Sequence, residues 1–290
     1  MKNKDSLYLK FIDCALELCE QVPRYFSKFS NKIFCNHQKI ILLVLKQKLR
    51  TTYRDLCELL KVSNIGMYIG LKRVPHYTTL VKFAKRVKPK ILNFLLPFRK
   101  AEMVGVDGTG FEVGNRSMHY MVRTERVDYR RHIKLGISAD MEKQIIFKSA
   151  IHKGPRHDTK DFLQIVKGLE TNFVLADKGY DSKKNHKFVI HELGAKSLIK
   201  VRKNISKKCR STLRKRVANQ FDEKKYHQRS KVETIFSSIK RKYGSRLKAK
   251  TFNTQKKELI CKLIAHNIDK LIQVCQTHLR VSPQPLNNNL

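Results

Sequence analysis

Apolar residues recur every three or four positions through much of the first hundred residues, which predicts helices. The clearest such segment is 37–49. A second helix is expected to be capped by Thr51 or Thr52, with Asp55 three residues after Thr52 as a capping-box partner, and a third is expected near Thr78. Short basic helices at this spacing favour a helix-turn-helix-like DNA-binding bundle, although a helical cap with a purely structural role fits almost as well.

After residue 102 the spacing of the apolar positions becomes that of strands. Strands are expected at residues 103–107, 131–139, 143–151, 173–177 and 197–201. A helix capped by Asp158 separates the third strand from the fourth, a helix over 182–193 separates the fourth from the fifth, and the chain is mainly helical from about residue 211. This order predicts an α/β fold with a ribonuclease H-like mixed sheet.

These patterns divide the chain into three parts. An α-helical DNA-binding domain is expected over residues 1–100, with Pro89 and Pro97 marking the linker that ends it. A ribonuclease H-like catalytic domain is expected over 101–278. The segment 279–290 contains two prolines and three consecutive asparagines and is expected to be a disordered tail.

Composition adds a strong constraint on the partner. The chain has 290 residues with 62 Lys and Arg against 24 Asp and Glu, so its formal net charge is +38. A polyanion is the natural partner for such a protein, and nucleic acid is the first choice. A hydrophobic fraction of 41% is enough for a packed core and excludes a wholly disordered chain.

Membrane, secreted and zinc-binding classes do not fit the sequence. The longest purely aliphatic run, at residues 40–45, is far shorter than a bilayer requires. The N-terminal segment carries acidic residues and does not resemble a signal peptide, so a cytoplasmic protein is expected. The seven Cys are scattered without a CxxC motif, which favours idle thiols over a zinc site or a disulfide framework.

The charge is unevenly distributed along the chain. Residues 1–100 carry a net charge of +15 and residues 200–250 a net charge of +16, whereas residues 101–199 carry only +4. The middle segment holds 13 of the 24 carboxylates. This arrangement suits a metal-dependent nucleic-acid enzyme, in which carboxylates hold cations beside a phosphate while flanking basic segments contact the backbone.

Two of the central carboxylates follow four apolar residues and precede a glycine. Asp107 and Asp177 are each expected at the carboxyl end of a buried strand, where α/β folds place their ligands. The glycines Gly108, Gly110 and Gly179 would let the backbone turn away. Each Asp alone could simply begin a turn, but two on neighbouring strands indicate a shared site.

A third carboxylate lies in a predicted helix over residues 224–243. Its polar positions are Tyr226, Arg229, Glu233 and Lys240. At about 100° per residue these four side chains fall within an arc of roughly 60°, beside a separate apolar stripe that can pack on the sheet. The alternative is an ordinary Arg229–Glu233 ion pair on a surface helix, which does not account for the other two residues sharing the line.

The spacing Tyr-(2)-Arg-(3)-Glu-(6)-Lys over residues 226–240 resembles the signature of a group of insertion-sequence transposases, insertion sequence family four. The segments around Asp107 and Asp177 resemble the first two catalytic blocks of the same group. The resemblance covers about residues 100–275, and the helical N-terminal segment fits the domain that usually precedes the catalytic one.

The resemblance implies a DDE transposase. Asp107, Asp177 and Glu233 would bind two Mg²⁺ or Mn²⁺ ions per site and cut DNA, while Tyr226, Arg229 and Lys240 contact it. The implied partners are the terminal inverted repeats of the element and a double-stranded target, to which the 3′ ends are joined by transesterification. A homodimer would form in the synaptic complex, and the protein would act in the cytoplasm of a prokaryotic cell, associated with the nucleoid.

Two departures leave part of the mechanism open. Only 56 residues separate Asp177 from Glu233, which is too few for the β-rich insertion that some relatives carry there. The chain contains no Trp, so a hairpin pathway that uses a stacked tryptophan and a pathway without hairpins both remain possible. Two other functions compete with transposition, namely a repressor with a relic nuclease domain and a nuclease without strand transfer.

Overall fold

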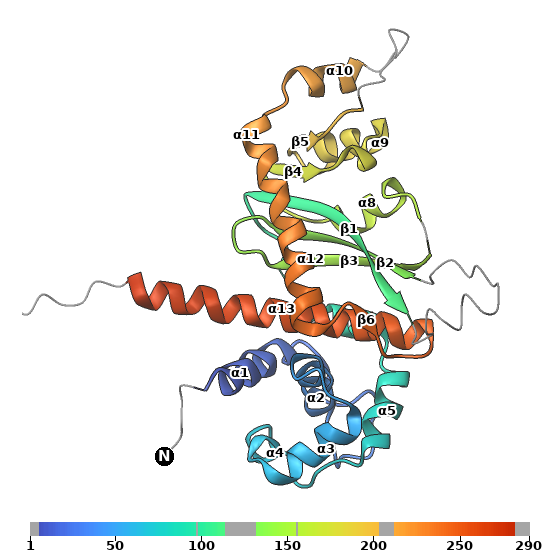
Figure 1. Ribbon diagram of the computed structural model, residues 1–290, viewed down its shortest axis with the longest axis vertical. Coiled ribbons are helices and arrows are strands. Elements are labelled where there is room, and N and C mark those ends of the chain that lie inside the picture. The colour runs from blue at the N-terminus through green and yellow to red at the C-terminus, as the bar shows by residue number, and fades with distance from the viewer. Residues whose placement is uncertain (1–5, 97, 114–131, 155, 203–211, 282–290) are drawn as a thin grey trace, which may run out of the picture.

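The computed structural model describes residues 6–96, 98–113, 132–154, 156–202 and 212–281 (Figure 1). Six helices form the N-terminal part. They are α1 (Leu7–Cys19), α2 (Asn36–Lys48), α3 (Tyr53–Val62), α4 (Ile65–Tyr68), α5 (Tyr77–Arg86) and α6 (Pro89–Asn93). None of the helices in the described ranges combines the length and the apolar character needed to cross a membrane.

The helical prediction for this part is confirmed, with one correction. The Thr52 hydroxyl accepts a hydrogen bond from the backbone N–H of Asp55 at 3.2 Å, and the Asp55 carboxylate accepts one from the N–H of Thr52 at 3.4 Å, so α3 begins with the expected capping box. Pro89 does not lie in a linker, because it occupies the first turn of α6, where its missing N–H costs no hydrogen bond. Pro97 lies outside the described residues.

One sheet organises the centre of the molecule. Its strands are β1 (Met103–Val113), β2 (His132–Asp140), β3 (Ile146–Lys153), β4 (Phe173–Ala176) and β5 (Lys196–Ile199). The order across the sheet is β3-β2-β1-β4-β5, in which β2 is antiparallel to β1 and β3, and β4 and β5 are parallel to β1 and to each other. This is the predicted ribonuclease H-like mixed sheet.

Strand β1 is longer than the sequence predicted. It does not end at Asp107 but continues to Val113, and its last residues pair with a short strand β6 (Arg246–Leu247). Gly108 and Gly110 are therefore strand residues and do not turn the chain away from the sheet. Because β2 pairs with β1 as far as Glu112, the extra length is stabilised by a full antiparallel ladder.

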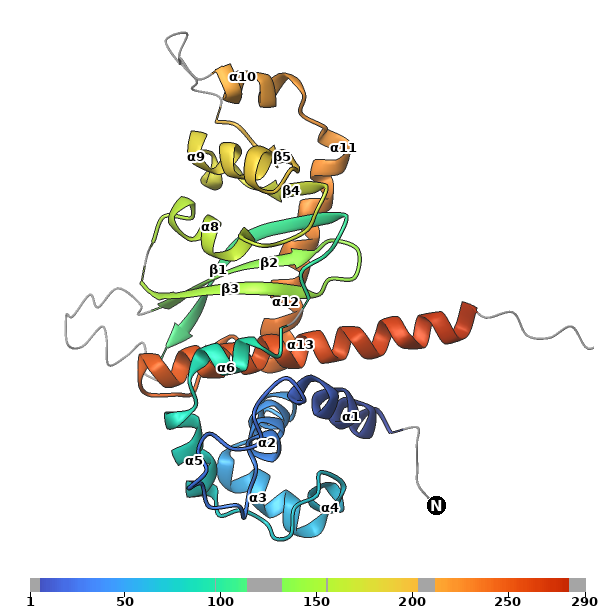
Figure 2. The same cartoon turned by 180° about the vertical axis from the view of Figure 1, so that it is seen from behind.

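Helices cover both faces of the sheet (Figures 1 and 2). On one face lie α8 (Thr159–Val166) and α9 (Lys183–Lys187), and on the other α12 (Ser230–Tyr243). The predicted helix over 224–243 is interrupted, because α11 (Glu223–Tyr226) is joined to α12 by the 3-10 turn η3 (His227–Arg229). The short helix α10 (Thr212–Asn219) precedes α11.

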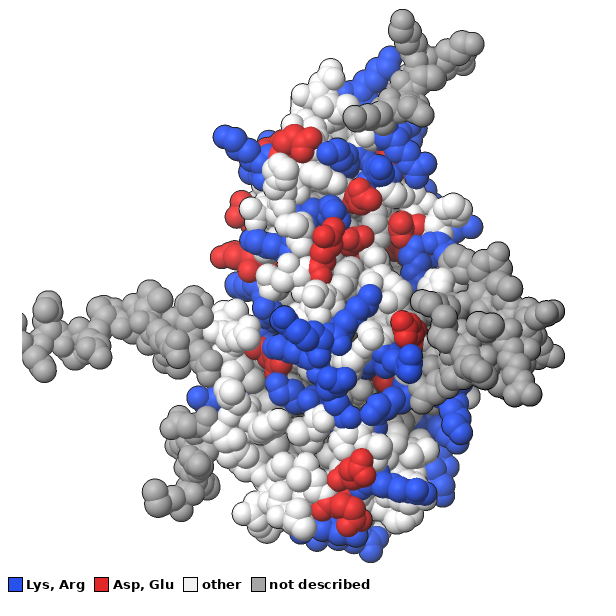
Figure 3. All heavy atoms as spheres, in the orientation of Figure 1, with Lys and Arg blue, Asp and Glu red and all other residues white. Residues whose placement is uncertain are grey.

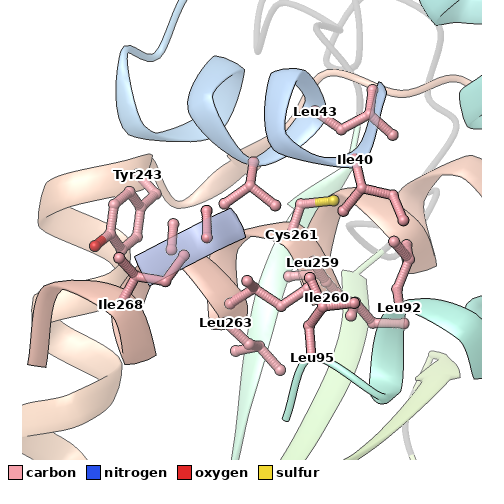
Figure 4. Close-up of a cluster of buried hydrophobic side chains, with 14 of the residues drawn as sticks. Ile40, Leu43, Leu92, Leu95, Tyr243, Leu259, Ile260, Cys261, Leu263 and Ile268 are labelled. Carbon is pink, nitrogen blue, oxygen red and sulfur yellow. The ribbon is translucent and has the colours of Figure 1, made fainter. Parts of the chain in front are cut away.

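The last helix, α13 (Phe252–Val281), lies between the sheet and the N-terminal helices (Figures 1 and 2). Apolar side chains of α13, including Cys261 and Leu263, belong to the same buried cluster as Ile40 and Leu43 of α2 (Figure 4). That cluster continues into the sheet and α12, so one core spans both parts of the chain. Residues 282–290, most of the expected tail, lie outside the described residues.

A buried carboxylate on α13 reinforces this junction. Asp269 accepts hydrogen bonds from Lys48 Nζ of α2 at 2.6 Å and from the Tyr243 hydroxyl of α12 at 2.8 Å. Lys242 Nζ lies 3.3 Å from its second oxygen. Burial acts to raise the pKa of Asp269, but these hydrogen bonds and the two lysines outweigh it and hold the pKa below its usual range. The carboxylate therefore stays charged and joins three helices.

Gly105 allows α12 to approach β1 closely. A Cβ atom at this position would lie 2.5 Å from Val232 Cγ2 of α12 and would also overlap the Met141 side chain, distances that real carbon atoms do not adopt. Both neighbouring side chains are fully buried and cannot move into solvent. The absence of a side chain at Gly105 therefore fixes the separation of strand and helix.

We expect Gly105→Ala to lower the free energy of unfolding by about 1–3 kcal/mol, because the extra methyl group overpacks a full core. Gly136→Ala on the adjacent strand is the matched control, since a Cβ there would meet its nearest side chain at an ordinary 3.8 Å. Urea unfolding of both variants measures the difference. Equal stabilities would show that α12 does not depend on Gly105 for its position.

Candidate active site

Asp107 and Asp177 lie side by side on one face of the sheet. The parallel pairing of β1 with β4 sets Val106 opposite Ala176, so the next residues are Asp107, still within β1, and Asp177, directly after the end of β4. Side chains alternate between faces, and Val106 and Ala176 belong to the core on the α8 side. Both aspartates therefore point to the α12 side, on neighbouring strands about 5 Å apart.

Glu233 reaches the same place from α12. It lies one residue after Val232, which packs against Gly105 two positions before Asp107 in β1. The side chain of Glu233 is 59% exposed, whereas that of Asp107 is 20% exposed. The Asp107 carboxylate is thus largely enclosed at the sheet, and the Glu233 carboxylate approaches it from the solvent side.

Arg229 bridges two of these carboxylates. Its Nη1 donates a hydrogen bond to Asp107 Oδ2 at 3.0 Å and its Nη2 donates to Glu233 Oε1 at 2.7 Å. The ion pair expected for a surface helix does form, but Arg229 also joins the helix to the sheet. Within the described ranges no group of three or more His, Cys, Asp and Glu side chains is arranged to hold a metal ion.

The ionisation of Asp107 is disfavoured at this position. Burial raises the pKa of its carboxyl group, and the nearby charges of Glu233 and Asp177 add to the increase. The backbone N–H of Gly108, which donates to Asp107 Oδ1 at 2.8 Å, and the charge of Arg229 oppose the increase without cancelling it. The negative charge of Asp107 is thus only partly compensated.

Lys240 and Tyr226 occupy opposite ends of the polar stripe. Lys240 Nζ donates a hydrogen bond to the Thr109 hydroxyl at 2.7 Å, two residues beyond Asp107 on the same face of β1. Burial lowers the pKa of Lys240. The buried Tyr226 ring packs against Phe221, with ring centroids 5.0 Å apart, and burial raises the pKa of its hydroxyl. Although the turn η3 interrupts the predicted helix, Tyr226 and Lys240 still line grooves that contain the carboxylates.

Arg229 links two grooves, because it lines the larger one and pairs with two carboxylates that line the smaller one. One, of about 640 Å³, is lined by Asp107, Glu233 and Lys240, and the other, of about 1170 Å³, by Asp177, Tyr226 and Arg229. Figure 3 shows acidic side chains gathered where α12 crosses the sheet, with lysines and arginines around them. All six predicted site residues therefore lie along one surface.

The larger groove also contains basic residues that the sequence did not single out. They are Lys178, Lys200, Arg202 and Arg214. They come from segments after β4 and β5 and from α10, which are far apart in the sequence. No spacing rule connects such positions. The high charge of residues 200–250 could have indicated Lys200, Arg202 and Arg214, but not Lys178.

Comparison with known protein families identifies the domain that carries these residues. The model of the transposase DDE domain matches residues 100–268, which is more than half of the chain and includes all six site residues. The chain belongs to the transposase DDE domain family. It is thus an enzyme of DNA cleavage and strand transfer, and it acts in DNA transposition. No curated protein matches the chain significantly.

A buried network supports the second carboxylate block of this transposase domain. Asp181, four residues after Asp177, accepts hydrogen bonds from His186 Nε2 at 3.1 Å and from Arg214, which pairs with both carboxylate oxygens. The N–H of Arg202 also donates to it at 3.0 Å. Burial acts to raise the pKa of Asp181, but these hydrogen bonds outweigh it and hold the pKa well below its usual range.

Asp158 has a role different from the predicted helix cap. It occupies the cap position of α8, but its side chain makes no capping hydrogen bond. Instead, its carboxylate pairs with Lys134 of β2. Asp158 Oδ2 would lie 3.0 Å from a Cβ atom on Gly179, so the glycine after Asp177 and Lys178 leaves room for this carboxylate rather than for a sharp turn.

Asp107 and Asp181 should affect stability in opposite directions. Because the folded-state pKa of Asp107 is raised, its charge opposes folding at pH 7, and this cost disappears as the pH falls through that pKa. Because the folded-state pKa of Asp181 is lowered, its charge favours folding above the ordinary Asp pKa, and this contribution is lost as the pH falls further.

At pH 7 without divalent cations, Asp181→Asn should lower the free energy of unfolding by about 3 kcal/mol, because Arg214 and His186 lose their charged partner. Asp107→Asn should leave it unchanged or raise it, because the neutral amide removes a repelled charge. Thermal melts of the two isosteric variants measure both effects. A loss of stability in Asp107→Asn as large as in Asp181→Asn would contradict this assignment.

Proposed function

We propose that this chain binds the terminal inverted repeats of an insertion sequence, cleaves the ends by metal-dependent hydrolysis and joins the 3′ ends to target DNA by transesterification. Residues 1–100 would recognise the repeats, residues 101–278 would perform the chemistry, and two copies would act together in the synaptic complex. The Tyr226-Arg229-Glu233-Lys240 spacing supports a place in insertion sequence family four.

The observation that supports this most directly is the approach of Asp177 and Glu233, from two separate elements, to Asp107, whose carboxyl group feels the charge of both. Asp107 and Asp177 follow a paired position on adjacent strands, and Glu233 is tied to Asp107 through Arg229. A structural role would not require acidic groups to approach one another at a buried position, where burial raises the pKa of Asp107 and the neighbouring carboxylates add to the increase. Such crowding is typical of a site that binds cations.

The donor set suits Mg²⁺ or Mn²⁺. Carboxylate oxygens are the ligands these hard cations prefer, and here they face one surface beside two grooves. Two ions bound by Asp107, Asp177 and Glu233 would activate the attacking water or 3′-hydroxyl and stabilise the leaving oxygen. In this structure the guanidinium group of Arg229 pairs with Asp107 and Glu233 and partly compensates their negative charge.

The basic residues would position the DNA strand. Arg229, released from the carboxylates when cations balance their charge, would contact a phosphate next to the scissile bond. Lys240, held beside Thr109, would contact a second phosphate from the smaller groove. Tyr226 lies between Phe221 and the larger groove, where its hydroxyl would bind the strand and its ring would stay packed. These contacts fix geometry and add little to bulk affinity.

We expect Asp107→Asn, Asp177→Asn and Glu233→Gln each to abolish cleavage of repeat ends in Mg²⁺ while leaving DNA binding nearly unchanged. Each substitution removes the charge of a cation ligand but keeps its volume. Single-turnover cleavage and a mobility-shift titration measure the two properties. Cleavage within about tenfold of the unsubstituted protein would exclude that residue as a ligand.

This assay also separates the two competing functions. A repressor with a relic nuclease domain would bind repeats and show no metal-dependent cleavage even without substitutions. A nuclease without strand transfer would cleave but fail to join pre-cut 3′ ends to a target plasmid.

Arg229→Ala should have opposite effects on cation binding and on catalysis. Removing the bridge frees Asp107 and Glu233, so Mn²⁺ should bind the DNA-free protein several-fold more tightly, as expected for losing an ion pair worth about 1 kcal/mol. Cleavage of pre-bound ends should fall by roughly 100-fold, because the phosphate contact is lost. Arg229→Lys should not restore the rate fully, because a lysine cannot make a bidentate contact.

Calorimetric Mn²⁺ titration and single-turnover cleavage measure these two changes. Lys224→Ala on the exposed surface of α11 is the matched control and should alter neither. Unchanged cleavage in Arg229→Ala would leave this residue with the structural role of a bridge between α12 and the sheet.

A further inference from the structure

A groove distinct from the two at the active site, with a volume of about 560 Å³, lies on the N-terminal helices. Its walls come from the segment that connects α1 to α2, from the start of α2 and from α5. Two large aromatic side chains line it and face solvent: Phe26 is 46% exposed and Phe29 is 85% exposed. Exposing such rings is unfavourable in water, so a ligand that covers them would gain binding free energy.

The aromatic rings are held in place by their neighbours. Phe26 lies parallel to the buried Phe83 of α5, with ring centroids 6.1 Å apart and planes inclined by 6°. The Ser27 hydroxyl accepts a hydrogen bond from the N–H of Phe29 at 3.1 Å, and the Ser30 hydroxyl accepts one from the N–H of Ser27 at 3.3 Å. A local turn therefore presents the exposed rings. Lys28 Nζ lies over the Phe29 ring, 5.1 Å from its centroid, and the rest of this exposed side chain stays accessible.

The charge around these rings has one sign. Lys39, Arg73, Lys82 and Arg86 line the groove, and no acidic residue is found among its described lining. The sequence extends this bias, since segments 21–54 and 59–101 contain no Asp or Glu. An anionic ligand is therefore favoured over a neutral apolar one.

We propose that this groove binds unpaired bases of single-stranded DNA. Bases stack on Phe26 and Phe29 while Lys39, Arg73, Lys82 and Arg86 contact the phosphates between them. In a duplex the faces of the bases are covered by their neighbours, so exposed ring faces gain little from it, whereas an unpaired base offers a flat apolar face. Such stacking tolerates any sequence.

This inference rests on the proposed function only in taking DNA as the partner. Cleavage and joining leave DNA strands without their complements near the ends of the element, and a stacking surface on the same chain would hold one of them. The groove and the carboxylates are separate surfaces, so each can fail its test without affecting the other.

The absence of Trp from the chain provides a direct test. Phe29→Trp introduces a single indole at the proposed stacking position, and binding of oligo(dT) in EDTA should quench its fluorescence. An equal concentration of duplex DNA should quench it much less. Quenching by polyglutamate but not by oligo(dT) would overturn the proposal and assign the groove to an acidic protein segment.

Affinities of the full-length chain complete the test. In EDTA, Phe29→Ala should weaken binding of labelled oligo(dT) by roughly 5- to 100-fold and change duplex binding by less than about twofold. Phe29→Tyr should retain binding. Phe94→Ala, at a ring that is also 46% exposed but lies at the end of α6, is the control and should have no effect. Equal losses for single-stranded and duplex DNA, or no loss, would overturn the proposal.

Discussion

At Gly105 the backbone of β1 and the side chains of α12 come into direct contact, and the geometry of the site depends on this approach. With Val232 seated on Gly105, the next residue of the helix is Glu233, and Arg229 one turn earlier reaches Asp107. The alternation of side chains along β1 then sets Asp107 and Thr109 on the same face, opposite Arg229 and Lys240. A wider spacing would separate all of these pairs.

The electrostatic balance differs between the two carboxylate blocks of this transposase domain. Asp181 accepts several hydrogen bonds, and its negative charge stabilises the folded state. Asp107 has one backbone donor and shares Arg229 with Glu233, so its charge is only partly compensated. Asp181 lies four residues after Asp177. The stabilisation from its hydrogen bonds offsets part of the unfavourable free energy of placing Asp177 near the other carboxylates.

Much of this arrangement could be predicted from the sequence because it follows local patterns. Helical periodicity, the Thr52–Asp55 capping box and the order of strands and helices gave the fold class. The three carboxylates were found from apolar runs that end in an acid and from the polar stripe of one helix. The extension of β1 beyond Asp107 was missed because it depends on pairing with β2 and β6.

The contacts of the charged groups could not be predicted from the sequence either. That Arg229 would bind Asp107 as well as Glu233 depends on the close packing of α12, and no spacing encodes it. Arg214 reaches Asp181 from 33 residues away. Asp158 has the sequence context of a helix cap, and its pairing with Lys134 depends on how β2 meets the start of α8.

The course of α13 has a consequence for folding. Its buried side chains complete the core of the N-terminal helices and, through α12, that of the sheet, and Asp269 binds α2 and α12 at once. The N-terminal helices are synthesised first, but their apolar core remains incomplete until α13 has been synthesised. Unfolding of either part would expose the apolar surface of the other, so the two should melt as one cooperative unit. A strand of DNA bound as proposed by the N-terminal helices would thus be attached, through α13, to the frame that carries the carboxylates.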